Sequence, residues 1–483
     1  MTNSTFRGHS VNRIGLFAGP WLPVALLVVA CTATVVWPGL VVAWTVLRGA
    51  IHQGLHSVDL IPSLPLLART FAWAGGIGVL SAVLAWPGAW LIRRRGWAVA
   101  PVILVPLLLP SYLAYSAYGL LRAPGTSIGD WIELAAQGGL KWLPTVAGEV
   151  LAVGGLSLWA WPIAAIVLGA SVSRLDEGVL ESLRLENMSA PRRWLTNIAM
   201  VRWGLVAGAG LVTLVMFGSA VPLHLAQVPT YSVKVWFDMT MDPGGWRVWV
   251  GAWPLVAVAA GAGWFISRAV ARQLAATSDA EPARQLAASS RTAGIATLAV
   301  WALSVLVPLA LFAGSLRDGR SIPRFWRLQS DSIWQSLAVA AAVALIGLAL
   351  TLAVWAGLSV SRTPRPNTAA PSATLWCIRA LLAAGLLPGV LVGAAISAAI
   401  QATEGPTGMD WLADSPAVMV LAHVARFGFV PALVGYWLYA TEPPSERDLR
   451  RIDGAEGLSG WCSTCLPTQA GTVAGAALGL SLI

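Results

Sequence analysis

The sequence has little charge. Charged residues make up 11% of its 483 residues and hydrophobic residues 57%, whereas an ordinary soluble domain carries about 25% charged residues. The hydrophobic residues gather into long runs, each near the ~20 residues that a helix needs to cross the hydrocarbon core of a bilayer. The composition therefore excludes an ordinary soluble fold and indicates a polytopic membrane protein surrounded by lipid.

Lysine is almost missing. Only Lys141 and Lys234 occur, so the net charge of +9 comes from arginine. A basic protein binds nucleic acid when its cations gather on one surface. Here the arginines are distributed over alternate connections between the apolar runs, which argues against a nucleic-acid partner.

Cysteine and histidine are scarce as well. Cys31 and Cys377 lie inside apolar runs, where we expect them to pack, and Cys462 and Cys465 form a single Cys-x-x-Cys pair. Zinc and redox sites of this spacing usually need further ligands, so we expect neither a metal nor a cofactor. The five histidines are scattered, which argues against a membrane enzyme acting on lipid, since such an enzyme needs clustered catalytic groups.

The apolar runs predict an all-α membrane bundle. Only helices and closed barrels span a bilayer, and these runs are too long and too evenly apolar for barrel strands. The expected spans are Trp21–Leu47, Phe71–Ile92, Val99–Leu121, Val146–Ser171, Trp203–Val221, Val248–Ile266, Thr292–Phe312, Ile333–Val360, Leu375–Ala399, Ala417–Ala440 and Thr468–Ile483.

Arginine placement predicts the orientation. The N-terminal segment and every second connection are rich in arginine: Arg7, Arg13, Arg93, Arg94, Arg95, Arg174, Arg184, Arg192, Arg193, Arg202, Arg268, Arg272, Arg284, Arg291, Arg362, Arg365, Arg447, Arg450 and Arg451. Basic residues favour the cytoplasmic side, so we expect a bacterial-type inner membrane protein with a cytoplasmic N-terminus. One connection is an exception to this distribution, because it lies on the expected outer side and contains Arg317, Arg320, Arg324 and Arg327.

The chain repeats itself loosely in two halves, residues 1–285 and 286–483. Leu-Leu-Pro occurs in the third run at Pro110, followed by Ser111, and in the ninth run at Pro388. An even number of spans separates the copies, so both have the same orientation. This parallel repeat of about six spans differs from the inverted repeats of many secondary transporters.

Each half also carries a charged loop, at residues 174–202 and 442–467. The pattern of each loop predicts a helix–turn–helix: an acidic residue begins the first helix, and Asn187 or Gly454 ends it. Asparagine and glycine tolerate the left-handed conformation that ends a helix, and Ser189 is a candidate N-cap of the next one. A single such loop would be an ordinary amphipathic connector, but two at matching places favour a docking role.

The two loops resemble the EAA loop of ABC importer permeases, which runs roughly Glu-Ala-Ala, then glycine, then Leu-Pro. The matching residues are Glu181, Ser182, Leu183, Asn187, Met200 and Val201 in the first loop, and Asp448, Leu449, Arg450, Gly454, Leu466 and Pro467 in the second. Asn187 replaces the glycine, and Met200-Val201 replaces Leu-Pro. The resemblance implies that these loops dock a separate ATPase subunit, expected as a homodimer.

The resemblance covers nearly the whole chain. It is similar in particular to the fused permeases of ferric iron importers, through Leu109-Pro110-Ser111-Tyr112, Ala425-Arg426-Phe427 and Phe217-Gly218. It implies a periplasmic binding protein that delivers the solute, with ferric iron as the first expectation; thiamine, phosphonate and polyamine importers have related permeases. In the family layout a twelfth span follows the second loop, so the second half is expected to lack its last span.

The chain has no Gly-x-x-x-x-Gly-Lys-Ser/Thr sequence, so we expect a transport subunit without its own ATPase site. The alternative is a gradient-driven secondary transporter. Such carriers usually keep acidic groups inside their spans, and no Asp or Glu lies in the middle of any run here, which argues against that alternative.

Arg426, with His423 one turn earlier, is the main charge inside a predicted span. We expect Arg426, His423, Pro110 and Ser111 to line a translocation pathway, where the guanidinium attracts an anionic or chelated solute. The alternative is a structural arginine that snorkels or bonds to backbone carbonyls. Tryptophans near predicted span ends are expected to form the interfacial aromatic belt: Trp21, Trp37, Trp44, Trp161, Trp203 and Trp246.

Overall fold

The computed structural model describes residues 21–54, 62–173, 175, 178, 182, 189–242, 244–277, 291–316, 319–360, 369–402, 412, 415–442 and 452. These residues are overwhelmingly helical and include no strand, which confirms the all-α prediction. Six of their helices are long and apolar enough to cross a membrane, or up to nine if each bent pair counts as one span. The chain is therefore a multi-pass helical membrane protein.

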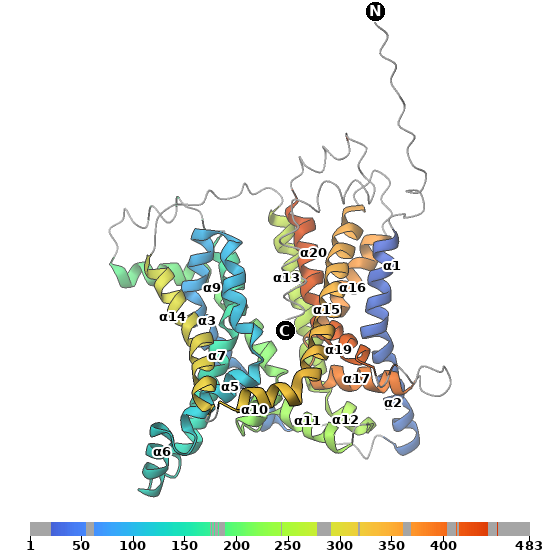
Figure 1. Cartoon of the computed structure of the whole chain (residues 1–483). Coiled ribbons are helices and arrows are strands. Elements are labelled where there is room, and N and C mark those ends of the chain that lie inside the picture. The colour runs from blue at the N-terminus through green and yellow to red at the C-terminus, as the bar shows by residue number, and fades with distance from the viewer. Residues whose placement is uncertain are drawn as a thin grey trace, which may run out of the picture.

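The helices follow the predicted apolar runs closely (Figure 1). In the first part of the chain they are α1 (Trp21–Cys31), η2 (Thr32–Val36), α2 (Trp37–Gln53), α3 (Leu64–Arg95), η4 (Trp97–Val99), α4 (Ala100–Leu104), η5 (Val105–Leu108), α5 (Ser111–Gly119), η6 (Leu120–Arg122), α6 (Ser127–Gln137), α7 (Leu143–Val172), α9 (Ala190–Phe217), α10 (Val221–Leu225), α11 (Tyr231–Met241), α12 (Trp246–Gly251) and α13 (Trp253–Thr277). They continue as α14 (Arg291–Ser315), α15 (Ser321–Val360), α16 (Ala369–Gly385), α17 (Gly389–Gln401), α19 (Ala417–Phe427) and α20 (Phe429–Thr441).

Four predicted spans are interrupted. The third, ninth and tenth are bent pairs of helices, with bends of 64°, 113° and 49°. The sixth, Val248–Ile266, was predicted as one helix and is divided at Ala252 between α12 and α13. Pro254 explains this correction, because proline removes a helical N–H and disfavours the helical conformation of the residue before it. The last predicted span, Thr468–Ile483, lies outside the described residues.

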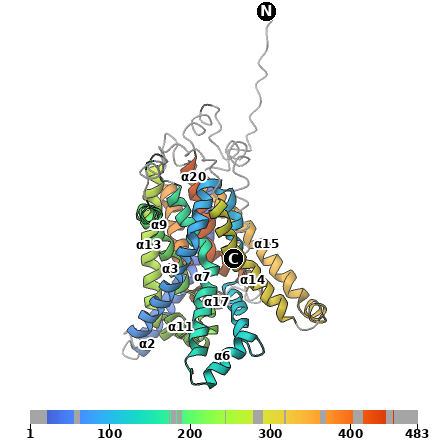
Figure 2. The same cartoon turned by 90° about the vertical axis from the view of Figure 1, so that its left-hand side faces the viewer.

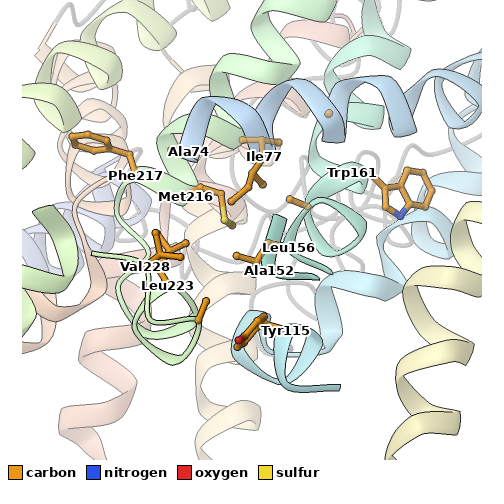
Figure 3. Close-up of a cluster of buried hydrophobic side chains, with 14 of the residues drawn as sticks. Ala74, Ile77, Tyr115, Ala152, Leu156, Trp161, Met216, Phe217, Leu223 and Val228 are labelled. Atoms are coloured by element: carbon orange, nitrogen blue, oxygen red, sulfur yellow. The ribbon is translucent and has the colours of Figure 1, made fainter. Parts of the chain in front are cut away.

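One bundle is built on α3, α7 and α9, which pack against one another along their lengths. Figure 3 shows side chains from these helices, among them Ile77, Leu156 and Met216, gathered in its buried core. Hydrogen bonds reinforce the packing, since the hydroxyls of Ser81 and Ser157 each donate to a carbonyl of the other helix at 3.3 Å. Small residues and interhelical hydroxyl bonds of this kind hold membrane helices together without a hydrophobic driving force.

The second bundle is built on α15, α16, α19 and α20. Thr351 of α15 donates to the carbonyl of Pro431 on α20 at 3.2 Å. A Cβ added at Gly435 would lie 2.5 Å from the carbonyl oxygen of Thr351. Glycine therefore allows the backbones of α15 and α20 to approach as closely as they do.

Each bundle includes helices from the other half of the sequence. In Figure 1, α1 and α13 stand with the second bundle and α14 with the first, and the packing agrees: α1 lies on α15 and α16, α13 on α16 and α20, and α14 on α3, α5 and α7. Hydrogen bonds hold α14 in place, from Trp161 to the hydroxyl of Ser304 at 2.8 Å and from Tyr118 to the carbonyl of Leu303 at 2.5 Å. The packing thus crosses the boundary between residues 285 and 286.

The aromatic-belt prediction is wrong for two tryptophans. Trp161 is fully buried inside the first bundle, and Figure 3 shows its indole directed toward α14. Trp246 is 6% exposed, and its indole N–H donates to Gln53 at 3.1 Å, which joins α12 to α2. A buried indole must satisfy its N–H, so each of these tryptophans is a structural tie between helices. Trp37, Trp44 and Trp203 are exposed, as an interfacial position requires.

The packing of α1 on α16 predicts a cross-link across most of the sequence. Cys31 and Cys377 are buried in one core, with their thiols in hydrogen-bond contact. With Cys462 and Cys465 replaced by serine, mild oxidation of the full chain should join Cys31 to Cys377, because adjacent thiols can reach disulfide geometry. Proteolysis and mass spectrometry under non-reducing conditions detect the joined peptides. Cys377→Ser is the control, and a reactive Cys31 that never pairs with Cys377 would contradict the packing of α1.

Candidate functional site

Two helix breaks share the same local backbone. Pro110 separates η5 from α5, and Pro388 separates α16 from α17. The backbone angles are φ −52° and ψ 136° at Pro110, and φ −52° and ψ 133° at Pro388. In both places the carbonyl of the proline accepts the amides of the third and fourth residues of the next helix, at 2.9 and 3.1 Å for Pro110 and 2.9 and 3.2 Å for Pro388. The two Leu-Leu-Pro sequences therefore produce one repeated structural device.

At each break, the backbone carbonyl of the residue before the proline needs a hydrogen-bond donor from elsewhere in the chain. Because the new helix begins on the proline carbonyl, the carbonyl of the preceding residue does not enter its ladder. A side chain from the following span supplies a donor in each case. Trp159 of α7 donates to the carbonyl of Leu109 at 2.6 Å, and Arg426 of α19 donates to the carbonyl of Leu387 at 3.1 Å. An unpaired carbonyl in a low-dielectric interior costs several kcal/mol, about 2 to 7 by transfer estimates.

Glycines create the room for Arg426. A Cβ added at Gly389 would lie 2.4 Å from Nη1 of Arg426, and one added at Gly385 would lie 2.2 Å from the ring of Phe429. The α16–α17 break is thus a notch that receives the α19–α20 bend. The guanidinium also lies 5.4 Å from the ring centroid of Phe427, which is a favourable cation–π distance.

The notch around Pro388 also contacts the first half of the chain. A Cβ added at Gly218, directly after α9, would lie 3.3 Å from the Cα of Pro388. The following segments bridge both breaks, since α10 packs on α5 and α11 packs on α17. Leu391 of α17 is buried in the same core as Met216 of α9. The end of α9 and the second helix break are therefore mechanically linked.

For Arg426 the structure shows the contact that the structural alternative requires, since its guanidinium bonds to a backbone carbonyl. Among the described residues this guanidinium has one hydrogen bond and one ring contact, and no carboxylate lies within 4 Å of it. A guanidinium has five N–H donors. Capping Leu387 leaves donors for a second partner, so the pathway role stays a prediction beside the structural one.

The other predicted pathway residues do not join Arg426. His423 bonds through Nδ1 to the carbonyl of Met419 in its own helix at 2.8 Å. Pro110 and Ser111 form the first break, where Pro110 is exposed and Ser111 partly buried. Within the described chain, the Pro110 break packs on α7 and α14 and the Arg426 contact belongs to the Pro388 break. The four residues are thus distributed over two repeated sites.

Most of the predicted docking residues lie outside the described part of the chain: Glu181, Leu183, Asn187, Asp448, Leu449, Arg450 and Gly454. Ser182 is described, as helical and exposed. Ser189 occupies the N-cap position of α9 as predicted, but its side chain makes no capping hydrogen bond. Met200 and Val201, which replace the Leu-Pro of the motif, are inside α9. The 28-residue helix α9 therefore includes the last part of the predicted loop and runs without interruption to Phe217.

Trp159 is a site residue that the sequence did not predict. It lies in an apolar run and carries no charge, so hydropathy does not distinguish it from a packing residue. The position of Trp159 could have indicated its role. In each half, the span after the Leu-Pro break contains a side chain that can donate a hydrogen bond, Trp159 in the first half and Arg426 in the second.

Gly389 and Gly393, one turn apart on α17, provide a matched test of the notch. Gly389→Ala should displace the guanidinium of Arg426 from Leu387, lowering the melting temperature in detergent and impairing any transport activity. Gly393→Ala should be neutral or stabilising, because nothing lies within 4 Å of its added Cβ and alanine favours a helix over glycine by about 1 kcal/mol. Differential scanning fluorimetry measures both. Equal effects of the two substitutions would refute the close contact at Gly389.

Comparison of the chain with protein-family models, with curated proteins and with solved structures finds no match. The resemblance to importer permeases therefore rests on the residues of this chain alone.

Proposed function

We propose that the chain is the membrane-spanning permease subunit of an ATP-driven ABC importer. In this proposal a periplasmic binding protein delivers a solute, and closure of a separate ATPase homodimer drives the solute into the cytoplasm. The observation that carries the proposal is the pair of EAA-like loops, at residues 174–202 and 442–467, at matching places in the two halves. The chain itself supplies the pathway and the mechanical coupling.

The helix α9 supports this coupling. It begins at Ala190, within the first predicted docking loop (residues 174–202), and ends at Phe217 beside the Pro388 break. An uninterrupted helix is held by hydrogen bonds at every turn, so a displacement at its N-terminal end is transmitted along it. In the proposed cycle, movement of the docked loop shifts α9, and Gly218 transmits the shift to the notch that holds Arg426.

Arg426 also bears on the form of the solute. A partly buried guanidinium repels a bare cation and attracts an anion, and the interaction is strong where the dielectric is low. If ferric iron is the cargo, the arginine favours an anionic or chelated form over the free ion. Thiamine, phosphonate and polyamine remain alternative solutes, and of these phosphonate carries the anionic charge that Arg426 would attract.

Reversing the loop charges tests the docking role. The double variant Glu181→Arg, Asp448→Arg should lose co-purification with the proposed ATPase subunit, because each substitution reverses the charge at the start of a predicted docking helix. Glu133→Arg is the matched control: it makes the same charge change at an exposed site on α6, before α7, whereas the first loop follows α7. Unchanged association of the double variant would show that these loops do not dock an ATPase.

The energy source separates the proposal from a gradient-driven carrier. Everted or reconstituted vesicles containing the chain with its ATPase should transport only when ATP is supplied, and an uncoupler should have little effect. We expect this because the sequence places no Asp or Glu in the middle of a predicted span, where a proton-coupled carrier usually has one. Uptake without ATP that collapses with an uncoupler would establish the gradient-driven alternative.

A further inference from the structure

The helix α15 is much longer than a membrane span requires. Its 40 residues extend about 60 Å at 1.5 Å per residue, twice the ~30 Å hydrocarbon core of a bilayer. Its C-terminal half carries the packing, through buried residues such as Val343, Val354 and Trp355. In Figure 2 its other end swings away from the rest of the molecule. Roughly half of α15 is therefore not needed to cross the hydrocarbon core.

This N-terminal half is amphipathic. Arg320, Arg324, Arg327 and Asp331 follow one another at intervals of three or four residues, which places them on one face of a helix. Ile322, Phe325 and Trp326 lie on the opposite face and are 63%, 55% and 54% exposed. Ile333 and Leu337 continue that apolar face toward the span. Three arginines against one aspartate give the polar face a net charge of +2.

The composition of these two faces is typical of a helix in a membrane interface. Interfacial helices carry arginine on the polar face and Trp, Phe or Leu on the other, with the apolar face buried about 5–10 Å into the boundary between headgroups and acyl chains. This segment is also continuous with a spanning helix, so it leaves the hydrocarbon core at headgroup depth. A large aromatic side chain such as Trp326 is stable at this depth.

We propose that residues 320–334 form an interfacial anchor whose arginine face binds the phosphates of anionic phospholipids. We infer a phospholipid as the ligand from charge complementarity. Arginine pairs with phosphate oxygens in a bidentate geometry, and each basic residue near an anionic membrane surface contributes favourably to binding. The apolar face beside it needs acyl chains, which a lipid surface provides at the same place. The proposal is independent of the transported solute and of the energy source.

The anchor accounts for the one connection that contradicts the positive-inside pattern. Arg320 directly precedes α15, and Arg324 and Arg327 lie in its first two turns on one face. The arginine bias that orients membrane proteins acts on short loops near span ends. Arginines that lie on a helix along the headgroups serve a different contact, so the orientation predicted from the other connections is consistent with them.

Amide exchange in defined lipid tests the anchor. The full chain is placed in nanodiscs of phosphatidylcholine alone and in nanodiscs containing phosphatidylglycerol as well, and exchange of residues 320–334 is followed by mass spectrometry. Phosphatidylglycerol should slow exchange there by at least about tenfold, and high salt should remove the difference by screening. Peptides from α7 serve as an internal control and should exchange equally in both lipids.

Two triple variants make the test specific. Replacement of Arg320, Arg324 and Arg327 by glutamine should abolish the lipid dependence, and replacement of the same three by lysine should retain most of it, because the charge is kept. Equal exchange of the wild-type segment in the two lipids, or a glutamine variant that keeps the full difference, would overturn the proposal. Protection that appears only when a soluble protein is added would also overturn it, by assigning this face to a protein partner.

Discussion

Every backbone carbonyl that a helix break exposes inside the bilayer must find a donor, and the architecture around the two proline breaks follows from this requirement. Pro110 and Pro388 each start a new helix on their own carbonyl and leave the preceding carbonyl outside the ladder. The tryptophan and the arginine that cap these carbonyls come from the next span in each half. Lipid offers no water to take their place, so each bent pair is tied to the helix that follows it.

The same device is built with different chemistry in the two halves. An indole has a single N–H, which Leu109 consumes, whereas a guanidinium retains further donors after it has capped Leu387. The first break is therefore complete in itself, while the second keeps a cationic group with capacity for another partner. Glycine at position 389 is what allows the guanidinium to fit, and glycine at position 385 leaves room for the ring of Phe429 and the backbone of Arg426. Two breaks with the same backbone geometry thus differ in polarity, because only the Pro388 break contains a cationic group.

The sequence predicted most of the helices because hydropathy over some twenty residues reports directly on span length. It located α3, α7, α14 and α15, but it did not predict that the two spans containing Leu-Leu-Pro would be interrupted. It did not predict that α1 and α13 pack in the second bundle and α14 in the first. A hydropathy profile contains no information on which apolar faces meet. It misassigned Trp161 for the same reason. The role of Trp159 depends on a carbonyl fifty residues away along the chain.

The placement of α1 has a consequence for biogenesis. Among the described helices this one is synthesised first, yet the helices it packs on, α15 and α16, follow about three hundred residues later. Until then its packing face must be covered by lipid or by a holding factor, because the bundle it belongs to does not yet exist. Packing partners so distant in sequence slow assembly. Because these helices belong to one polypeptide, α1 stays at high local concentration near its late partners, which assists assembly.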